Sequence, residues 1–124
     1  MIFLDTHVVI WLYANLLDKL SKDAIQQIED NDLLITQMVR LELQYLFEIG
    51  RIKVTPETII KDLNKSIGLK ISQMKVEQVF DYAIDYQWTR DVFDRLITAE
   101  AEAMGFALIT KDKNILAHYE KAIW

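Results

Sequence analysis

The chain contains 124 residues, of which 52% are hydrophobic and 27% are charged. This composition excludes an intrinsically disordered protein and suffices for one domain with its own core, which we expect to span residues 1–124. The formal net charge of −5 argues against a protein that binds nucleic acid through a broad basic surface. The absence of cysteine excludes disulfides, thiolate metal sites and cysteine nucleophiles, and fits a cytoplasmic protein.

The first twenty residues, MIFLDTHVVIWLYANLLDKL, are apolar but do not have the pattern of a signal peptide or a membrane span. They have no basic leader and no small-residue cleavage site, and Asp5 and His7 interrupt the apolar run. We therefore predict no membrane association. The segment indicates a buried strand that continues into a helix.

Apolar periodicity and capping residues predict the remaining elements in chain order. Ser21 fits a helix N-cap, Thr55-Pro56 marks another helix start, and Gly50 and Gly105 each mark a helix end. The predicted strands are residues 1–4, 32–36, 69–71, 106–110 and 122–124. The predicted helices are residues 6 to about 17, 22 to about 30, 37–49, 56 onward, 76 to about 86, 92–104 and 112 to about 119.

Strands and helices alternate along the whole chain, which is the pattern of an α/β protein. We predict a three-layer α/β/α sandwich with a central, mostly parallel sheet of four to five strands. In such sheets, ligands bind at the carboxyl ends of the strands. Residues that follow the strands are therefore the first candidates for a functional site.

Two aspartates lie at such strand ends. Asp5 directly follows the strand at residues 1–4, and Asp112 lies two residues beyond the strand at 106–110. Both are candidates for a functional site on the ground of their position. Each also fits a helix N-cap, and this simpler interpretation stays open for either residue taken alone.

Glu42 is the more informative acid. Arg40, Gln44 and Glu48 share one face of the helix predicted for residues 37–49. At about 100° per residue, Glu42 lies roughly 160° from the centre of that polar face. A carboxylate on an apolar face is costly unless a cation or hydrogen bonds compensate for it. The alternative is a glutamate that pairs with a buried Arg or Lys, or that reaches solvent at the helix edge.

Asp91 and Asp94 open the helix predicted for residues 92–104. Acids in a first helical turn are stabilised by the helix dipole, and the Asp91-x-x-Asp94 spacing resembles a capping box. By itself, this pair indicates no particular function.

Together, the acids Asp5, Glu42, Asp94 and Asp112 predict a metal site. Carboxylates that converge at one end of a sheet repel one another unless a hard cation lies between them. Oxygen ligands of this kind suit Mg²⁺ or Mn²⁺. Such an ion lowers the pKa of bound water and neutralises a phosphate, so the predicted chemistry is phosphodiester hydrolysis.

Other catalytic arrangements have little support. His7 is more typical of the core or of a helix edge than of a catalyst, and His118 is typical of the surface. The sequence contains no phosphate-binding glycine loop, no serine-nucleophile motif and no HExxH motif.

Four stretches, by their order and spacing, resemble one known family. They are MIFLDTHVVIW, LLITQMVRLELQYLFEIGRI, RDVFDRLITAEAEAMGFALIT and the TKD that follows. In these stretches the chain resembles the PIN-domain ribonucleases, in particular the VapC-type toxins of bacterial and archaeal toxin–antitoxin pairs. It departs from the family in having DVFDRL where DPFDRL is usual, and Thr36-Gln37 where a serine is common. Neither change falls on a predicted ligand.

The resemblance implies a PIN-like fold and a role for each matched position. The metal-binding and catalytic acids fall on Asp5, Glu42, Asp94 and Asp112. An accessory acid falls on Asp91, and hydroxyl groups beside the site fall on Thr6 and Thr110. The implied activity is metal-dependent cleavage of RNA that leaves a 5′-phosphate and a 3′-hydroxyl. The resemblance also implies a homodimer and inhibition by a small antitoxin whose tail reaches the acidic site.

Basic and aromatic residues supply candidates for partner surfaces. Arg40, Arg51, Arg95 and Lys111 lie in the segments that carry the acids and are candidates for RNA contacts, although solvated surface charge explains any one of them. Core packing explains most of the aromatic residues, and some are candidates for a dimer or antitoxin surface.

Three other functions remain as alternatives. A response-regulator receiver fits the length and the Thr110-Lys111 pair, but the chain lacks an acidic pair after the first strand. A PIN-like binding module without activity would not need all four acids. A flap-type DNA nuclease would use the same metal chemistry, but we expect such enzymes to need further substrate-binding segments.

Overall fold

The computed structural model describes residues 1–124 and contains one five-stranded sheet. Its strands are β1 (Ile2–Leu4), β2 (Leu33–Ile35), β3 (Lys70–Ile71), β4 (Ala107–Ile109) and β5 (Ala122–Ile123). They lie in the order β3-β2-β1-β4-β5, and every pairing is parallel. The doubly wound sheet of receiver domains has the order 2-1-3-4-5, so the receiver hypothesis is wrong.

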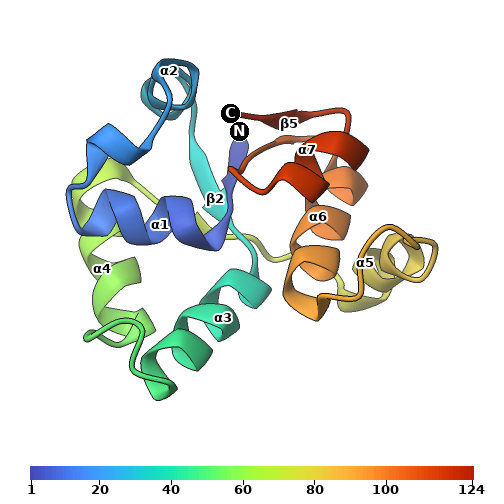
Figure 1. Cartoon of the computed structure of the whole chain (residues 1–124), viewed down its shortest axis with the longest axis horizontal. Coiled ribbons are helices and arrows are strands. Elements are labelled where there is room, and N and C mark those ends of the chain that lie inside the picture. The colour runs from blue at the N-terminus through green and yellow to red at the C-terminus, as the bar shows by residue number, and fades with distance from the viewer.

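Seven helices surround the sheet, with one short 3₁₀ turn at Leu17–Lys19. They are α1 (Thr6–Tyr13), α2 (Lys22–Asp30), α3 (Gln37–Glu48), α4 (Pro56–Ile67), α5 (Val76–Ala83), α6 (Val92–Met104) and α7 (Lys113–His118). In Figure 1, α1, α2 and α4 lie on one side of the sheet, and α5, α6 and α7 lie on the other. The predicted three-layer α/β/α sandwich is confirmed, and its sheet is wholly parallel. None of the helices combines the length and the apolar character that crossing a membrane requires.

Most predicted boundaries are confirmed within one or two residues, and local capping explains why. Ser21 caps α2 by accepting from the Ala24 N–H at 3.0 Å, and Thr55 caps α4 ahead of Pro56. Gly105 ends α6 with φ of 73°, a backbone conformation in which a Cβ is unfavourable.

Two helices end earlier than predicted. The helix expected to reach about Leu17 stops at Tyr13, because Asn15 turns the chain with φ of 57°. Leu16 and Leu17 continue the apolar spacing but are 39% and 45% exposed, so the pattern there does not reflect burial. The helix expected over residues 76–86 stops at Ala83.

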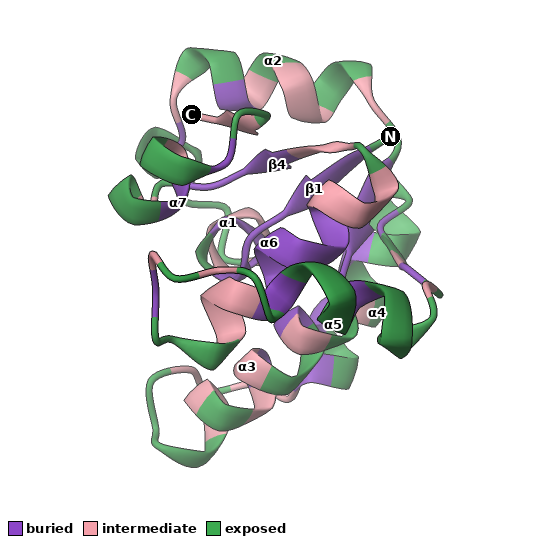
Figure 2. Ribbon diagram, turned by 90° about the vertical axis from the view of Figure 1, so that its right-hand side faces the viewer, coloured by how far each residue is buried: buried purple, intermediate pink, exposed green.

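The core is built on the strands of the sheet. Ile2, Phe3 and Leu4 of β1 are at most 1% exposed, as expected for a strand covered on both faces. They belong to a core cluster of 21 buried residues that also includes Ile97 and Ala101 of α6. Figure 2 shows this buried interior as β1, β4 and the inner side of α6. The rigid sheet therefore sets the positions of the residues that follow β1 and β4.

Candidate metal centre

Carboxylates from four separate segments line one cavity of about 410 Å³. β1 pairs with β4 so that Leu4 lies opposite Ile109, and the N–H of Asp5 donates to the Ile109 carbonyl at 3.0 Å. The cavity thus lies at the carboxyl ends of these two central strands. Its lining residues are Asp5, His7, Trp11, Glu42, Asp91, Asp94, Lys111 and Asp112.

Asp5 is fixed in the cavity by hydrogen bonds to both carboxylate oxygens. Oδ1 accepts from the N–H of Thr6 at 2.8 Å, and Oδ2 accepts from the hydroxyl of Thr110 at 2.7 Å. The side chain is only 6% exposed, and this burial raises the pKa of Asp5 even though both hydrogen bonds favour the carboxylate.

Glu42 reaches the cavity from α3 and is held by Thr6, whose hydroxyl donates to Glu42 Oε1. Burial, with smaller contributions from the charges of Asp5 and Asp91, raises the pKa of Glu42 to about 7. The alternative of a glutamate paired with a buried Arg or Lys is wrong. The one ion pair in the structure joins Arg40 to Glu57.

Asp94 lies among the other acids at the start of α6. Burial is the main cause that raises the pKa of Asp94 to about 7. The charges of Asp5, Asp91, Asp112 and Glu42 raise it further, and no hydrogen bond offsets them. Its own N–H donates to Oδ1 of Asp91 at 2.9 Å, so Asp91 is the N-cap of α6. The acids are therefore close enough to repel one another.

Asp112 closes the cavity from the side of α7. Its Oδ1 accepts from the N–H of Ile115 at 2.8 Å, and its own N–H donates to the hydroxyl of Thr110 at 3.0 Å. Asp5 and Asp112 are both helix N-caps and cavity residues. The two interpretations of these acids are therefore compatible.

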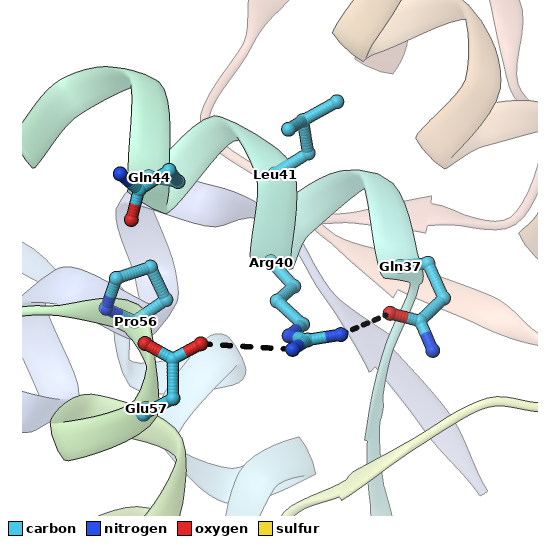
Figure 3. Close-up of a pocket in the computed structure, with 6 residues that line it drawn as sticks. All are labelled: Gln37, Arg40, Leu41, Gln44, Pro56 and Glu57. Atoms are coloured by element: carbon cyan, nitrogen blue, oxygen red, sulfur yellow. Dashed lines mark hydrogen bonds and ion pairs between the residues drawn. The ribbon is translucent and has the colours of Figure 1, made fainter. Parts of the chain in front are cut away.

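The structure brings only one of the four basic candidates into the cavity, which is Lys111. Arg40 lies in a different groove, where it pairs with Glu57 at 3.6 Å and donates to Gln37 (Figure 3). The guanidinium of Arg95 donates to the carbonyls of Ala83 and Tyr86 and so joins α6 to the end of α5. Arg51 is exposed beyond the end of α3.

Two cavity residues were not among the predicted site residues, namely His7 and Trp11. His7 does not lie in the core, because its side chain is exposed and lines the cavity; the alternative expectation, a position at the edge of the helix, is compatible with this exposure. The spacing of His7 and Trp11, four residues apart in the helix that follows Asp5, could have indicated that both lie near the site. α1 starts at the cavity with Asp5 as its cap, and residues four apart share a helix face.

The donor set of the cavity fits a hard divalent cation, since it offers five carboxylates and no thiolate. As the side chains stand, no three Asp, Glu or His groups are placed to hold one ion. Oδ1 of Asp91 and Oδ1 of Asp112 each accept from a backbone N–H. A cation held by three or more of these acids would therefore require some of their side chains to rotate.

Comparisons with known proteins identify the family and the fold of this chain. Residues 2–121 match the family model of the PIN domain. VapBC2 from Rickettsia felis, bound to a DNA fragment from its promoter, is similar in structure, with 18% identity and a TM-score of 0.71 over 99% of this chain and 96% of that chain. A toxin–antitoxin complex from Klebsiella pneumoniae is also similar, with 15% identity and a TM-score of 0.67 over 100% of this chain and 97% of that chain.

FitAcB from Neisseria gonorrhoeae has 20% identity and a TM-score of 0.52 over 100% of this chain and 96% of that chain. Among curated proteins, none matches the sequence. The family match extends from the start of β1 to three residues beyond α7 and includes every acid of the cavity. The chain belongs to the PIN domain family.

Proposed function

We propose that this protein is a Mg²⁺- or Mn²⁺-dependent endoribonuclease and the toxin of a VapBC-type toxin–antitoxin pair. PIN domains are generally nucleases that depend on divalent metal ions. The observation that carries the proposal is the convergence of five carboxylates, from four segments, in one cavity at the carboxyl ends of β1 and β4. Such a concentration of negative charge would repel a phosphodiester unless a cation is bound.

Each acid has a role in this proposal. Asp5, Glu42, Asp94 and Asp112 are the metal ligands, and Asp91 is an accessory acid that caps the helix bearing Asp94. When bound, the ion supplies an activated water and neutralises the charge of the scissile phosphate.

Two hydroxyl groups support these acids. Thr110 and Thr6 orient Asp5 and Glu42 through hydrogen bonds, so these two carboxylates need little rearrangement to meet an ion.

The first test compares single-stranded RNA with DNA of the same sequence, each in Mg²⁺, in Mn²⁺ or in EDTA. We expect cleavage of RNA with either metal, products with a 5′-phosphate and a 3′-hydroxyl, and no cleavage in EDTA. Asp94→Asn should lower the rate by at least about 100-fold, because loss even of residues that support a metal ligand costs about 10- to 100-fold. Asp62→Asn, the same change at an exposed acid of α4, should leave the rate unchanged.

Each of the other possible results would support a different explanation of the protein. Equal cleavage of DNA would favour the DNA nuclease alternative. Cleavage that survives EDTA or Asp94→Asn would indicate a contaminant. A folded protein that cleaves neither polymer with either metal would be a PIN-fold binding module.

We also propose that residues 1–124 act as one domain, as a cytoplasmic homodimer that a small antitoxin inhibits. The similar structures from Rickettsia felis and Klebsiella pneumoniae contain toxin–antitoxin proteins, and both align along nearly the whole chain. Three exposed apolar side chains offer surface for a protein partner, namely Phe80 of α5, Ile84 directly after α5, and Val92 of α6. Co-expression with a small protein encoded next to this gene should give a stable complex that lacks ribonuclease activity.

A further inference from the structure

We propose that Lys111 is the phosphate-binding cation of the cavity, and that the indole rings of Trp11 and Trp124 are positioning residues that hold its ammonium group there. This inference rests on the proposed ribonuclease function and names the group that binds the RNA backbone beside the acids. Trp11 and Lys111 both line the acidic cavity. The RNA phosphate in question is one next to the cleaved bond.

The ammonium group of Lys111 lies at nearly the same distance from two neighbouring indole rings. Nζ is 5.7 Å from the ring centroid of Trp11 and 5.8 Å from that of Trp124. The two indole centroids are 6.0 Å apart, and their planes are tilted by 60°. Both distances fall within the range of a cation–π interaction, for which tryptophan is the best partner. A flexible lysine side chain is thus restricted to one region of the cavity.

The backbone that carries these residues is also fixed. Lys111 lies between Thr110, whose N–H donates to the Ile123 carbonyl at 3.1 Å, and Asp112, the cap of α7. Trp124 directly follows β5, which pairs with β4. The arrangement around Lys111 is therefore built on the same rigid sheet as the acids.

The charge of Lys111 remains available for a ligand. It is the only Lys or Arg among the residues that line the cavity, beside five carboxylates. It nevertheless forms no ion pair with any of them, since the one ion pair of the structure joins Arg40 to Glu57. A cation–π interaction does not occupy the N–H donors of the ammonium group in the way that a carboxylate does. Those donors can bind a phosphate oxygen.

Lys19 provides a matched control for Lys111, because its ammonium group lies near the same indole ring, that of Trp11. Nζ of Lys19 is 6.0 Å from the ring centroid of Trp11, but Lys19 does not line the cavity. Lys111→Gln and Lys19→Gln therefore remove the same charge from the same indole. Only Lys111→Gln removes it from the cavity.

The test measures binding of a labelled single-stranded RNA by fluorescence anisotropy, with Ca²⁺ in place of Mg²⁺, over a series of salt concentrations. We expect Lys111→Gln to raise Kd by about 10-fold and to reduce the slope of log K against log salt by about 0.7, the value for one phosphate contact on a single strand. Lys111→Arg should restore most of the affinity. Lys19→Gln should change neither the affinity nor the slope.

A double-mutant cycle tests the positioning role of the indoles. Trp11→Leu should weaken RNA binding in the parent protein but should have little further effect when combined with Lys111→Gln. Trp11→Phe, which keeps an aromatic ring near the ammonium group, should weaken binding less than Trp11→Leu does. Trp124→Leu provides the same test should Trp11→Leu fail to fold. A tryptophan with a merely structural role would weaken binding equally in both backgrounds, and that result would overturn the positioning role.

The outcomes separate this inference from the proposed function. If Lys111→Gln behaves as Lys19→Gln does, the inference is wrong, even if the protein cleaves RNA. If RNA binding depends on Lys111 but no cleavage occurs with any metal, the phosphate contact of Lys111 is supported, whereas the proposed ribonuclease function, and with it the place of that phosphate beside a cleaved bond, is wrong. If the parent protein does not bind RNA, both are wrong.

Discussion

Thr6 and Thr110 show how single hydroxyl groups organise acids that repel one another. Both side chains are fully buried, and each donates a hydrogen bond to a carboxylate of the cavity. Thr110 also accepts from the N–H of Asp112, so one oxygen connects the two acids that follow β1 and β4. Such bonds stabilise the charged form of a carboxylate and fix its orientation.

Glu100 on α6 is a buried acid that has no part in the proposed chemistry. It is 7% exposed, and its Oε2 has no hydrogen-bond partner. Burial raises the pKa of Glu100, while the nearby hydroxyl group of Ser72 opposes this shift. The folded protein therefore favours the protonated form more than the unfolded chain does. Its contribution to stability is full below the unfolded pKa and is lost as pH rises through the folded pKa.

Glu100→Gln should consequently flatten the pH dependence of stability. The melting temperature of the parent protein should fall more steeply between pH 5 and pH 8 than that of the variant, measured by thermal denaturation in the absence of metal. Glu102→Gln, a change at a less buried acid of the same helix, is the control for altered helix charge. If the melting temperatures of the parent protein and of Glu100→Gln depend on pH in the same way, burial does not raise the pKa of Glu100.

At the scale of elements, three helices begin at the cavity. Asp5, Asp91 and Asp112 are the N-caps of α1, α6 and α7, and all three line the cavity. Each cap accepts a hydrogen bond from a backbone N–H, and helix N-termini favour negative charge nearby. The fold thus provides partial compensation for the acids before any cation binds.

Variants of Asp112 can separate its two roles. Asparagine is as good an N-cap as aspartate, so Asp112→Asn should keep the stability of the protein while losing most RNA cleavage. Asp112→Ala should lose the activity and also about 1 kcal/mol of the free energy of unfolding. Urea denaturation and a ribonuclease assay on the same preparations would measure both effects.

Ser21→Ala is the matched control for capping, since Ser21 caps α2 and does not line the cavity. It should cost a similar free energy of unfolding without loss of activity. Full activity in Asp112→Asn would mean that Asp112 serves only as a cap.

At the scale of the whole molecule, folding gathers negative charge in one place. The pKa values of Glu42 and Asp94 rise to about 7, chiefly because of burial and then because of the neighbouring acids. Both groups bind protons more tightly in the folded protein than in the unfolded chain. Their contribution to stability is therefore full below about pH 4, the range of unperturbed carboxyl groups, and is lost as pH rises to about 7.

The stabilisation by metal should consequently grow with pH. Without metal, the melting temperature should fall from pH 5 to pH 8, and Mg²⁺ or Mn²⁺ should raise it more at pH 8 than at pH 5, because the ion binds the deprotonated acids. Asp94→Asn should reduce both effects. The same metal-induced shift at both pH values would mean that the cavity acids are not the binding site.

Much of the architecture follows from local patterns that the chain contains in consecutive residues. Ser21, Thr55-Pro56 and Gly105 mark helix boundaries that depend only on neighbouring backbone groups, and each was confirmed. The short apolar runs predicted all five strands, and their alternation with helices predicted the α/β class. Asp5 and Asp112 could be placed at one sheet edge because parallel strands end on the same side.

What the sequence determined by itself was thus the type and order of the elements, the strand ends, and the acids that a parallel sheet brings to one edge. Only the tertiary structure decided which other side chains join them. It placed His7, Trp11 and Lys111 in the cavity, and directed Arg95 to backbone carbonyls instead. Caps and periodicity act within one turn or one strand, whereas the lining of a cavity depends on how distant elements pack around the sheet.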